Sequence, residues 1–191
     1  MLNIVLFGPP GSGKGTQSCK IIEKYRLMHI STGDLLREEV AASTELGLQA
    51  KSIMERGELV SDEIVIGMIR KKVEEHKEGP GFIFDGFPRT VEQARELRKV
   101  LADYDEHVAV MISLEVPREE LVKRLLNRGK ETGRTDDNLE TINNRIDVYN
   151  NQTIPVTYYY DKMRKHASVD GIGSVEKIFD RIVDVIEEVQ K

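Results

Sequence analysis

Three short runs of apolar residues stand out along the chain, over residues 2–7, 81–85 and 108–114. The first run is closed by Gly-Pro-Pro-Gly at residues 8–11, and the second is closed by Gly86. None of them alternates apolar with polar positions, which is typical of parallel strands covered on both faces. The pattern therefore predicts three buried parallel strands, each followed by a loop.

Segments with the apolar spacing of amphipathic helices separate these runs. Residues 14–25 are expected to form the helix after the first loop, and residues 117–128 a helix with Pro117 as its first residue. The inward positions of the second helix are Leu121, Leu125 and Leu126. A stripe of seven apolar residues predicts another helix near the C-terminus. The stripe consists of Val175, Ile178, Phe179, Ile182, Val185, Ile186 and Val189.

Strands that alternate with helices indicate an α/β fold built on a parallel sheet, with the loops after the strands on one ligand-binding edge. The 191 residues suit a single domain that buries its own core. The net charge of −5, with both signs intermixed, argues against nucleic acid as a general partner. Cys19 is the only cysteine, which excludes disulfides within the chain and cysteine-based zinc sites. The sequence shows neither a signal peptide nor a transmembrane stretch, so we expect a cytoplasmic protein.

A phosphate-binding loop follows the first predicted strand. Residues 8–14 (Gly-Pro-Pro-Gly-Ser-Gly-Lys) match the first seven positions of the P-loop pattern and open a helix. Glycines let backbone N–H groups surround phosphate oxygens, the helix N-terminus adds positive charge, and Lys14 reaches the β- and γ-phosphates. Gly15 occupies the usual Ser/Thr position and Thr16 follows it, which makes a direct hydroxyl ligand to Mg²⁺ doubtful. The fold class predicted is therefore a P-loop NTPase-type parallel sheet flanked by helices.

The P-loop and three later blocks together carry a family resemblance. Residues 13–17 (Gly-Lys-Gly-Thr-Gln) have the form typical of nucleoside monophosphate kinases. Residues 31–37 (Ser-Thr-Gly-Asp-Leu-Leu-Arg), 85–90 (Asp-Gly-Phe-Pro-Arg-Thr) and 133–137 (Gly-Arg-Thr-Asp-Asp) resemble adenylate kinases in the right order. The resemblance covers almost the whole chain. It implies reversible phosphoryl transfer from MgATP to AMP, giving two ADP.

The resemblance also implies how the chain is divided. A core of residues 1–30, 61–126 and 138–191 would carry an AMP-binding arm over residues 31–60 and a lid over residues 127–137. That lid is short and lacks the inserted hairpin that holds zinc in some relatives, so the expected cofactor is Mg²⁺ with ATP and no zinc. The family further implies a monomer.

Most candidate site residues follow from the same resemblance. The residues expected at AMP are Thr32, Arg37, Glu58, Leu59, Val60, Gly86, Phe87, Pro88, Arg89, Gln93, Arg134 and Arg145. The residues expected at ATP are Gly11, Ser12, Gly13, Lys14, Gly15, Thr16, Arg124, Arg128 and Gly173. The catalytic set is Lys14, Arg89, Arg128, Arg134 and Arg145. It suits the chemistry because an ionised AMP phosphate needs alignment and charge neutralisation instead of a general base.

Three acidic residues are candidates for two roles each. Asp85 follows an apolar strand, so it is either a strand-end cap or an organiser of Mg²⁺, acting through water. Asp136 and Asp137 resemble the carboxylates that pair with arginines as a lid closes, and they also suit helix N-caps before Leu139. Sequence alone does not separate these roles.

Three alternatives compete with the adenylate kinase interpretation. A kinase of UMP or CMP is disfavoured by Thr32 and Gln93, since an amide offers both the donor and the acceptor that adenine's edge requires. A P-loop switch or regulatory binder is disfavoured because the Asn-Lys-x-Asp guanine motif is absent and the arginines would be surplus. A non-catalytic interaction protein would leave the blocks at residues 85–89 and 133–137 unexplained.

Overall fold

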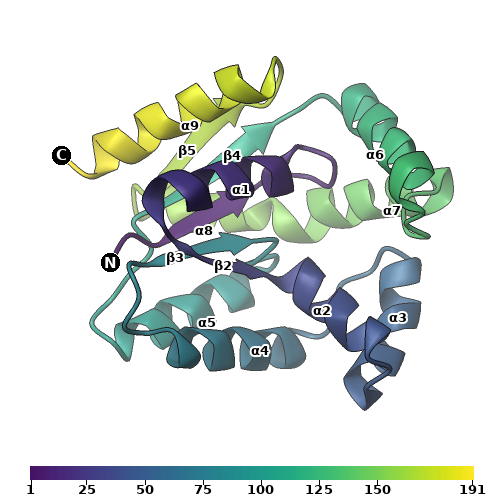
Figure 1. Cartoon of the computed structure of the whole chain (residues 1–191), viewed down its shortest axis with the longest axis horizontal. Coiled ribbons are helices and arrows are strands. Elements are labelled where there is room, and N and C mark those ends of the chain that lie inside the picture. The colour runs from purple at the N-terminus through teal and green to yellow at the C-terminus, as the bar shows by residue number, and fades with distance from the viewer.

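Five parallel strands form one sheet in the order β2-β3-β1-β4-β5 (Figure 1). The computed structural model describes residues 1–191. The strands are β1 Ile4–Phe7, β2 Met28–Ser31, β3 Phe82–Asp85, β4 Val110–Glu115 and β5 His166–Asp170. In the central register, Ile4 of β1 lies between Ile83 of β3 and Val110 of β4. The predicted α/β fold with a parallel sheet is confirmed.

Helices cover both faces of this sheet (Figure 1). They are α1 Lys14–Tyr25, α2 Thr32–Ala41, α3 Glu45–Glu55, α4 Asp62–Glu75, α5 Val91–Ala102, α6 Arg118–Thr132, α7 Leu139–Val148, the π-helical turn η1 Tyr149–Thr153, α8 Pro155–Asp161 and α9 Val175–Val189. Helices α1 and α9 pack on one face, and α4, α5 and α8 on the other. None of the helices combines the length and the apolar composition that crossing a membrane requires.

The side chains of β1 alternate between two hydrophobic cores. Ile4 and Leu6 pack with residues of α1 and α9, whereas Val5 and Phe7 pack with residues of α4, α5 and α8. All four residues are at most 4% exposed. Both faces of the strand are therefore apolar, which is why its sequence shows no alternation.

The three predicted strands and three predicted helices are present, with shifted ends. The helix over 14–25 has the predicted bounds, but the one predicted over 117–128 is α6, which starts after Pro117 and runs to Thr132. Pro117 is its N-cap residue and not its first helical residue. In α9, Val175 and Val189 are exposed although the stripe placed them inward, whereas Val183 is buried.

Helices α2 and α3 project from the sheet beyond β2 and pack closely on each other (Figure 1). A Cβ atom at Gly47 would lie 2.0 Å from the backbone oxygen of Glu39, so only glycine permits this approach. Each helix has a side-chain N-cap: Ser31 accepts from the Asp34 amide and Thr44 from the Gly47 amide. This helix pair lies within the predicted arm.

Candidate functional site

A cavity of about 500 Å³ opens at the carboxyl ends of the strands. Phe7 and Asp85, the last residues of β1 and β3, lie in its wall, together with Ser31 at the end of β2. Residues of the phosphate loop, α2, α6 and α7 complete it. This is the edge at which parallel α/β sheets bind ligands.

The phosphate loop folds around the amine of Lys14. Its Nζ donates to the backbone oxygens of Gly8 at 2.7 Å and Pro9 at 2.9 Å. Gly13, the N-cap residue of α1, has a φ of 98°, in the left-handed region that favours glycine. All the hydrogen bonds of the amine go to oxygens of its own loop, so the ammonium has no carboxylate partner.

Burial lowers the pKa of Lys14 to about 8 because the wall of the cavity disfavours the charged form. Asp85 opposes this shift, while the charges of Arg89, Arg145 and Arg128 add to it. Several positive charges that repel one another inside one cavity form a binding site for an anion.

Arg89 is the second cation held without a carboxylate. Its Nε donates to the backbone oxygen of Gly86 at 2.7 Å, and its guanidinium makes no other hydrogen bond within the protein. Burial first, and then the charge of Arg145, lower its pKa to about 10. A buried guanidinium with unused donors favours a phosphate or a carboxylate from outside the chain.

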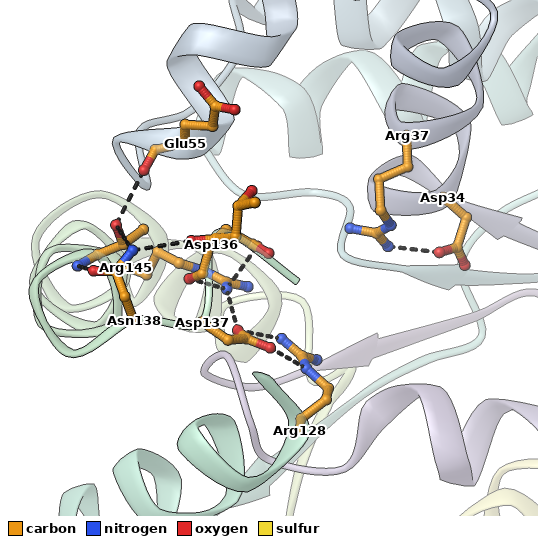
Figure 2. A network of polar contacts seen from close by, with 10 residues as sticks. Asp34, Arg37, Glu55, Arg128, Asp136, Asp137, Asn138 and Arg145 are labelled. Carbon is orange, nitrogen blue, oxygen red and sulfur yellow. Dashed lines mark hydrogen bonds and ion pairs between the residues drawn. The ribbon is translucent and has the colours of Figure 1, made fainter. Parts of the chain in front are cut away.

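The predicted lid and α7 share a compact network of two arginines and two aspartates (Figure 2). Asp137 accepts two hydrogen bonds from Arg128, from Nε at 2.6 Å and from Nη2 at 2.7 Å. Arg145 donates through Nη1 to Asp136 at 2.8 Å and to Asp137 at 3.0 Å. Asp137 is fully buried between the two guanidinium groups, whereas Asp136 lines the cavity. The N-cap of α7 is Asn138, so neither aspartate has the alternative N-cap role.

The other predicted arginines lie around the same cavity. Arg37 forms an ion pair with Asp34 one helical turn away (Figure 2). Arg134 makes no side-chain hydrogen bond, and its pKa is lowered by partial burial and by the charges of Arg37 and Arg128. Arg124 donates to Glu120 at 2.8 Å and to the backbone oxygen of Gly171 at 3.2 Å.

The predicted arm is tied to α7 at the end of α3. The Oγ1 of Thr141 donates to the backbone oxygen of Glu55 at 3.0 Å, and Asn144 donates to the backbone oxygen of Arg56. Gly57 allows this contact, because a Cβ there would lie 2.6 Å from the Arg145 side chain. The end of the arm therefore contacts α7, the helix that carries Arg145, at the wall of the cavity.

A second cavity, of about 20 Å³, is lined by residues predicted to surround the AMP base. They include Thr32, Leu59, Val60, Gly86 and Gln93. The Oγ1 of Thr32 donates to the backbone oxygen of Gly86 at 2.8 Å, which joins α2 to the loop after β3.

Most predicted site residues line one of the two cavities. Those in the larger one are Gly11, Gly13, Lys14, Gly15, Thr16, Arg37, Glu58, Leu59, Val60, Asp85, Gly86, Phe87, Pro88, Arg89, Arg124, Arg128, Arg134, Asp136 and Arg145. Three predicted residues line neither cavity. Ser12 is buried within the phosphate loop, and Asp137 is buried against Arg128. Gly173 lies in the loop before α9, two residues after Gly171, whose backbone oxygen accepts from Arg124.

Some residues of the site were missed by sequence analysis. Tyr149 and Thr153 reach the large cavity from η1, and no motif marks them. Asp34 lies within residues 31–37, but the resemblance implies no role for it. Asp62 contacts Gln93 across 31 residues of sequence, a separation that no local pattern reveals.

One acidic side chain of the cavity suits Mg²⁺ carried by a nucleotide. The Asp85 side chain is 12% exposed and lies at the end of β3. Its negative charge partly offsets the lowering of the Lys14 pKa. No three His, Cys, Asp or Glu side chains gather into a metal-binding group. A single carboxylate fits Mg²⁺, which keeps several waters and binds mainly through substrate phosphates.

Comparison with known proteins agrees with this geometry. The family model for adenylate kinase matches residues 6–165. The adenylate kinase of Parabacteroides distasonis is 53% identical over 190 residues, covering 100% of both chains. That of Phocaeicola vulgatus is 50% identical over 188 residues, 98% of this chain and 100% of the relative. That of Xanthomonas campestris pv. campestris is 46% identical over 181 residues, 95% of this chain and 97% of the relative. The chain therefore belongs to the adenylate kinase family.

Proposed function

We propose that the large cavity holds AMP and MgATP facing each other, so that the γ-phosphoryl group of ATP passes to the AMP phosphate and two ADP result. AMP lies on the side of α2 and the loop after β3, and ATP lies on the phosphate loop. The observation that carries this placement is the pair of cations Lys14 and Arg89, which line the cavity from the phosphate loop and from the loop after β3 and have no carboxylate partner.

Charge neutralisation is the main task of such a site. Two polyanions repel each other strongly where water is excluded. Lys14, Arg89 and Arg134 supply positive charge that no carboxylate of the protein neutralises by direct pairing. The planar fork of arginine donates two parallel hydrogen bonds to a phosphate. The AMP oxygen is already ionised, so these residues align and neutralise, and none of them removes a proton.

The AMP base is assigned to the part of the large cavity that adjoins the small one. Thr32, Gln93 and the backbone from Glu58 to Val60 surround it, while Arg37 and Arg89 hold the phosphate. Support comes from Leu59, Val60 and Gly86, which line both cavities. The small cavity, of about 20 Å³, has room for little more than one water molecule, so it must widen to admit the edge of the base.

ATP is assigned to the phosphate loop from Gly11 to Thr16, with Arg124, Arg128 and Gly173 toward its base. Mg²⁺ arrives with ATP and is held by the nucleotide phosphates and by Asp85 through water. When bound, it neutralises charge on the phosphates.

The lid aspartates are proposed to hold the arginines until phosphates replace them. Arg128 and Arg145 are both engaged by Asp136 or Asp137. Nucleotide phosphates offer the same bidentate acceptor geometry, so the two arginines can change partners as residues 127–137 close. Closure excludes water, which would otherwise attack ATP. A cytoplasmic monomer with this core, arm and lid remains our prediction.

The test is ADP formation from MgATP with AMP, CMP, UMP and GMP offered separately. We expect rapid turnover with AMP alone. Turnover with CMP or UMP instead would contradict the assignment of Thr32 and Gln93 to adenine. No transfer to any acceptor would contradict the catalytic placement and favour a regulatory nucleotide binder.

The pKa of Lys14 predicts a pH dependence. Only the ammonium form neutralises phosphate, and in the free protein it is lost above pH about 8. We expect kcat/KM for MgATP to fall about tenfold per pH unit above that value, because this parameter reports the free enzyme. Steady-state rates between pH 6 and 10 measure it. The residual activity of Lys14→Arg should lack this fall, since a guanidinium stays charged; the same fall in the variant would assign it to another group.

A further inference from the structure

We propose that Asp62 is a positioning residue that fixes the orientation of the Gln93 amide and thereby sets selectivity for the adenine base. The inference rests on the proposed AMP site. Asp62 lines neither cavity, so it acts through Gln93 and not by touching the substrate.

Two hydrogen bonds tie Asp62 to the start of α5. Its Oδ1 accepts from Nε2 of Gln93 at 2.8 Å, and its Oδ2 accepts from the hydroxyl of Thr90 at 2.9 Å. The same hydroxyl accepts from the backbone N–H of Gln93 at 3.1 Å, which caps α5. The Asp62 carboxylate therefore accepts hydrogen bonds both from the side chain of Gln93 and from Thr90, the N-cap residue of α5.

The two ends of the Gln93 amide have different partners. The backbone N–H of Arg89 donates to Oε1 at 2.7 Å, opposite the contact of Nε2 with Asp62. Turning the amide over would set an oxygen against the carboxylate and an NH₂ group against an N–H. Both contacts would be repulsive, so the partners select one orientation.

The selected orientation leaves Gln93 with a defined capacity for a ligand. An amide has two N–H donors and two oxygen lone pairs, of which the protein uses one each. One donor and one acceptor remain on a side chain that is 1% exposed and lines the small cavity. Adenine presents the complementary pair, an acceptor at N1 and a donor at N6. Hypoxanthine presents the reverse pair, a donor at N1 and an acceptor at O6.

The position of Asp62 in the chain suits this role. It is the first residue of α4 and is separated only by Ser61 from the predicted arm, whose last residues border the small cavity. One carboxylate thus connects the end of the arm to the side chain that contacts the base. Glu63, the next residue of the same helical turn, is exposed and makes no hydrogen bond or ion pair, so it provides a matched control.

The experiment measures kcat and KM for AMP, IMP and MgATP in the wild type, Asp62→Ala, Asp62→Asn and Glu63→Ala. For Asp62→Ala we expect KM for AMP to rise about tenfold or more and the selectivity for AMP over IMP to fall by a similar factor, as for the loss of one buried polar contact. KM for MgATP should change less than about twofold. Asp62→Asn keeps an acceptor for Nε2 and should retain most of the selectivity, and Glu63→Ala should behave as the wild type.

A double-mutant cycle with Gln93→Ala separates positioning from a purely structural role. If Asp62 acts through Gln93, then Asp62→Ala should have no further effect on AMP selectivity once Gln93 is alanine. Unchanged selectivity in Asp62→Ala, or equal rises of KM for all three substrates, would overturn the inference. So would Asp62→Ala lowering the selectivity further in the Gln93→Ala background. If Asp62→Ala fails to fold, Asp62→Leu takes its place, because leucine has a similar size and accepts no hydrogen bond from Gln93, and unchanged selectivity in Asp62→Leu would overturn the inference. A wild type that transfers nothing to AMP would instead contradict the proposed function.

Discussion

Arg89→Ala is expected to lower kcat/KM for AMP by about 10³-fold, the scale on which an arginine stabilises phosphoryl transfer. Arg89 lines both cavities, and its guanidinium donates to the protein only at the backbone oxygen of Gly86. Its remaining donors are free for phosphate. We expect kcat to fall together with kcat/KM, because the developing charge on the transferred group depends on it more than the ground state does.

Stability should not follow activity in this variant. Burial lowers the pKa of Arg89, which means that the folded protein disfavours the charge it holds. The melting temperature of Arg89→Ala should therefore equal or exceed that of the wild type. The control is Arg95→Ala on α5, the helix that follows Arg89, whose guanidinium is exposed and pairs only with Glu92. Equal losses of activity in both variants would contradict a specific role for Arg89.

The parts of the fold that sequence could predict are those with a strong local signal. The strands of residues 82–85 and 110–115 are apolar on both faces, and α1 starts where the phosphate loop ends. Strands β2 and β5 were missed because polar residues interrupt the apolar ones in Met28-His-Ile-Ser31 and His166-Ala-Ser-Val-Asp170. They lie at the two edges of the sheet, and pairing with a central strand places them there.

The site shows the same division between local and long-range signals. The phosphate loop is a continuous motif, so Lys14 could be assigned from residues 8–14 alone. The five side chains that the resemblance predicts to be catalytic all line the large cavity. Asp62, Tyr149 and Thr153 were not found, since their contacts depend on how distant elements pack.

Asp137→Ala is expected to lower the free energy of unfolding by about 3 kcal/mol, the cost of breaking a buried ion pair from one side. The Asp137 side chain is 0% exposed and accepts hydrogen bonds from both Arg128 and Arg145. Its backbone also packs on α6 at Gly129, where a Cβ would lie 2.9 Å from the Cβ of Asp137. Removing the carboxylate leaves two neighbouring guanidinium groups without their shared counter-charge. This value is at the lower end of the usual cost of breaking a buried ion pair, because Arg128 is 33% exposed and regains part of its hydration.

Urea unfolding, with the midpoint and the m-value compared between variants, measures this change. The comparison variant is Asp136→Ala, whose carboxylate pairs with Arg145 alone. Its removal leaves Arg145 paired with Asp137, so the cost should be about 1 kcal/mol, that of one hydrogen bond. Saturating nucleotide should narrow the difference between Asp137→Ala and the wild type, because bound phosphates then supply acceptors to the same arginines. Equal costs for the two aspartates, or a difference that nucleotide leaves unchanged, would contradict the proposed exchange of carboxylate for phosphate in the lid.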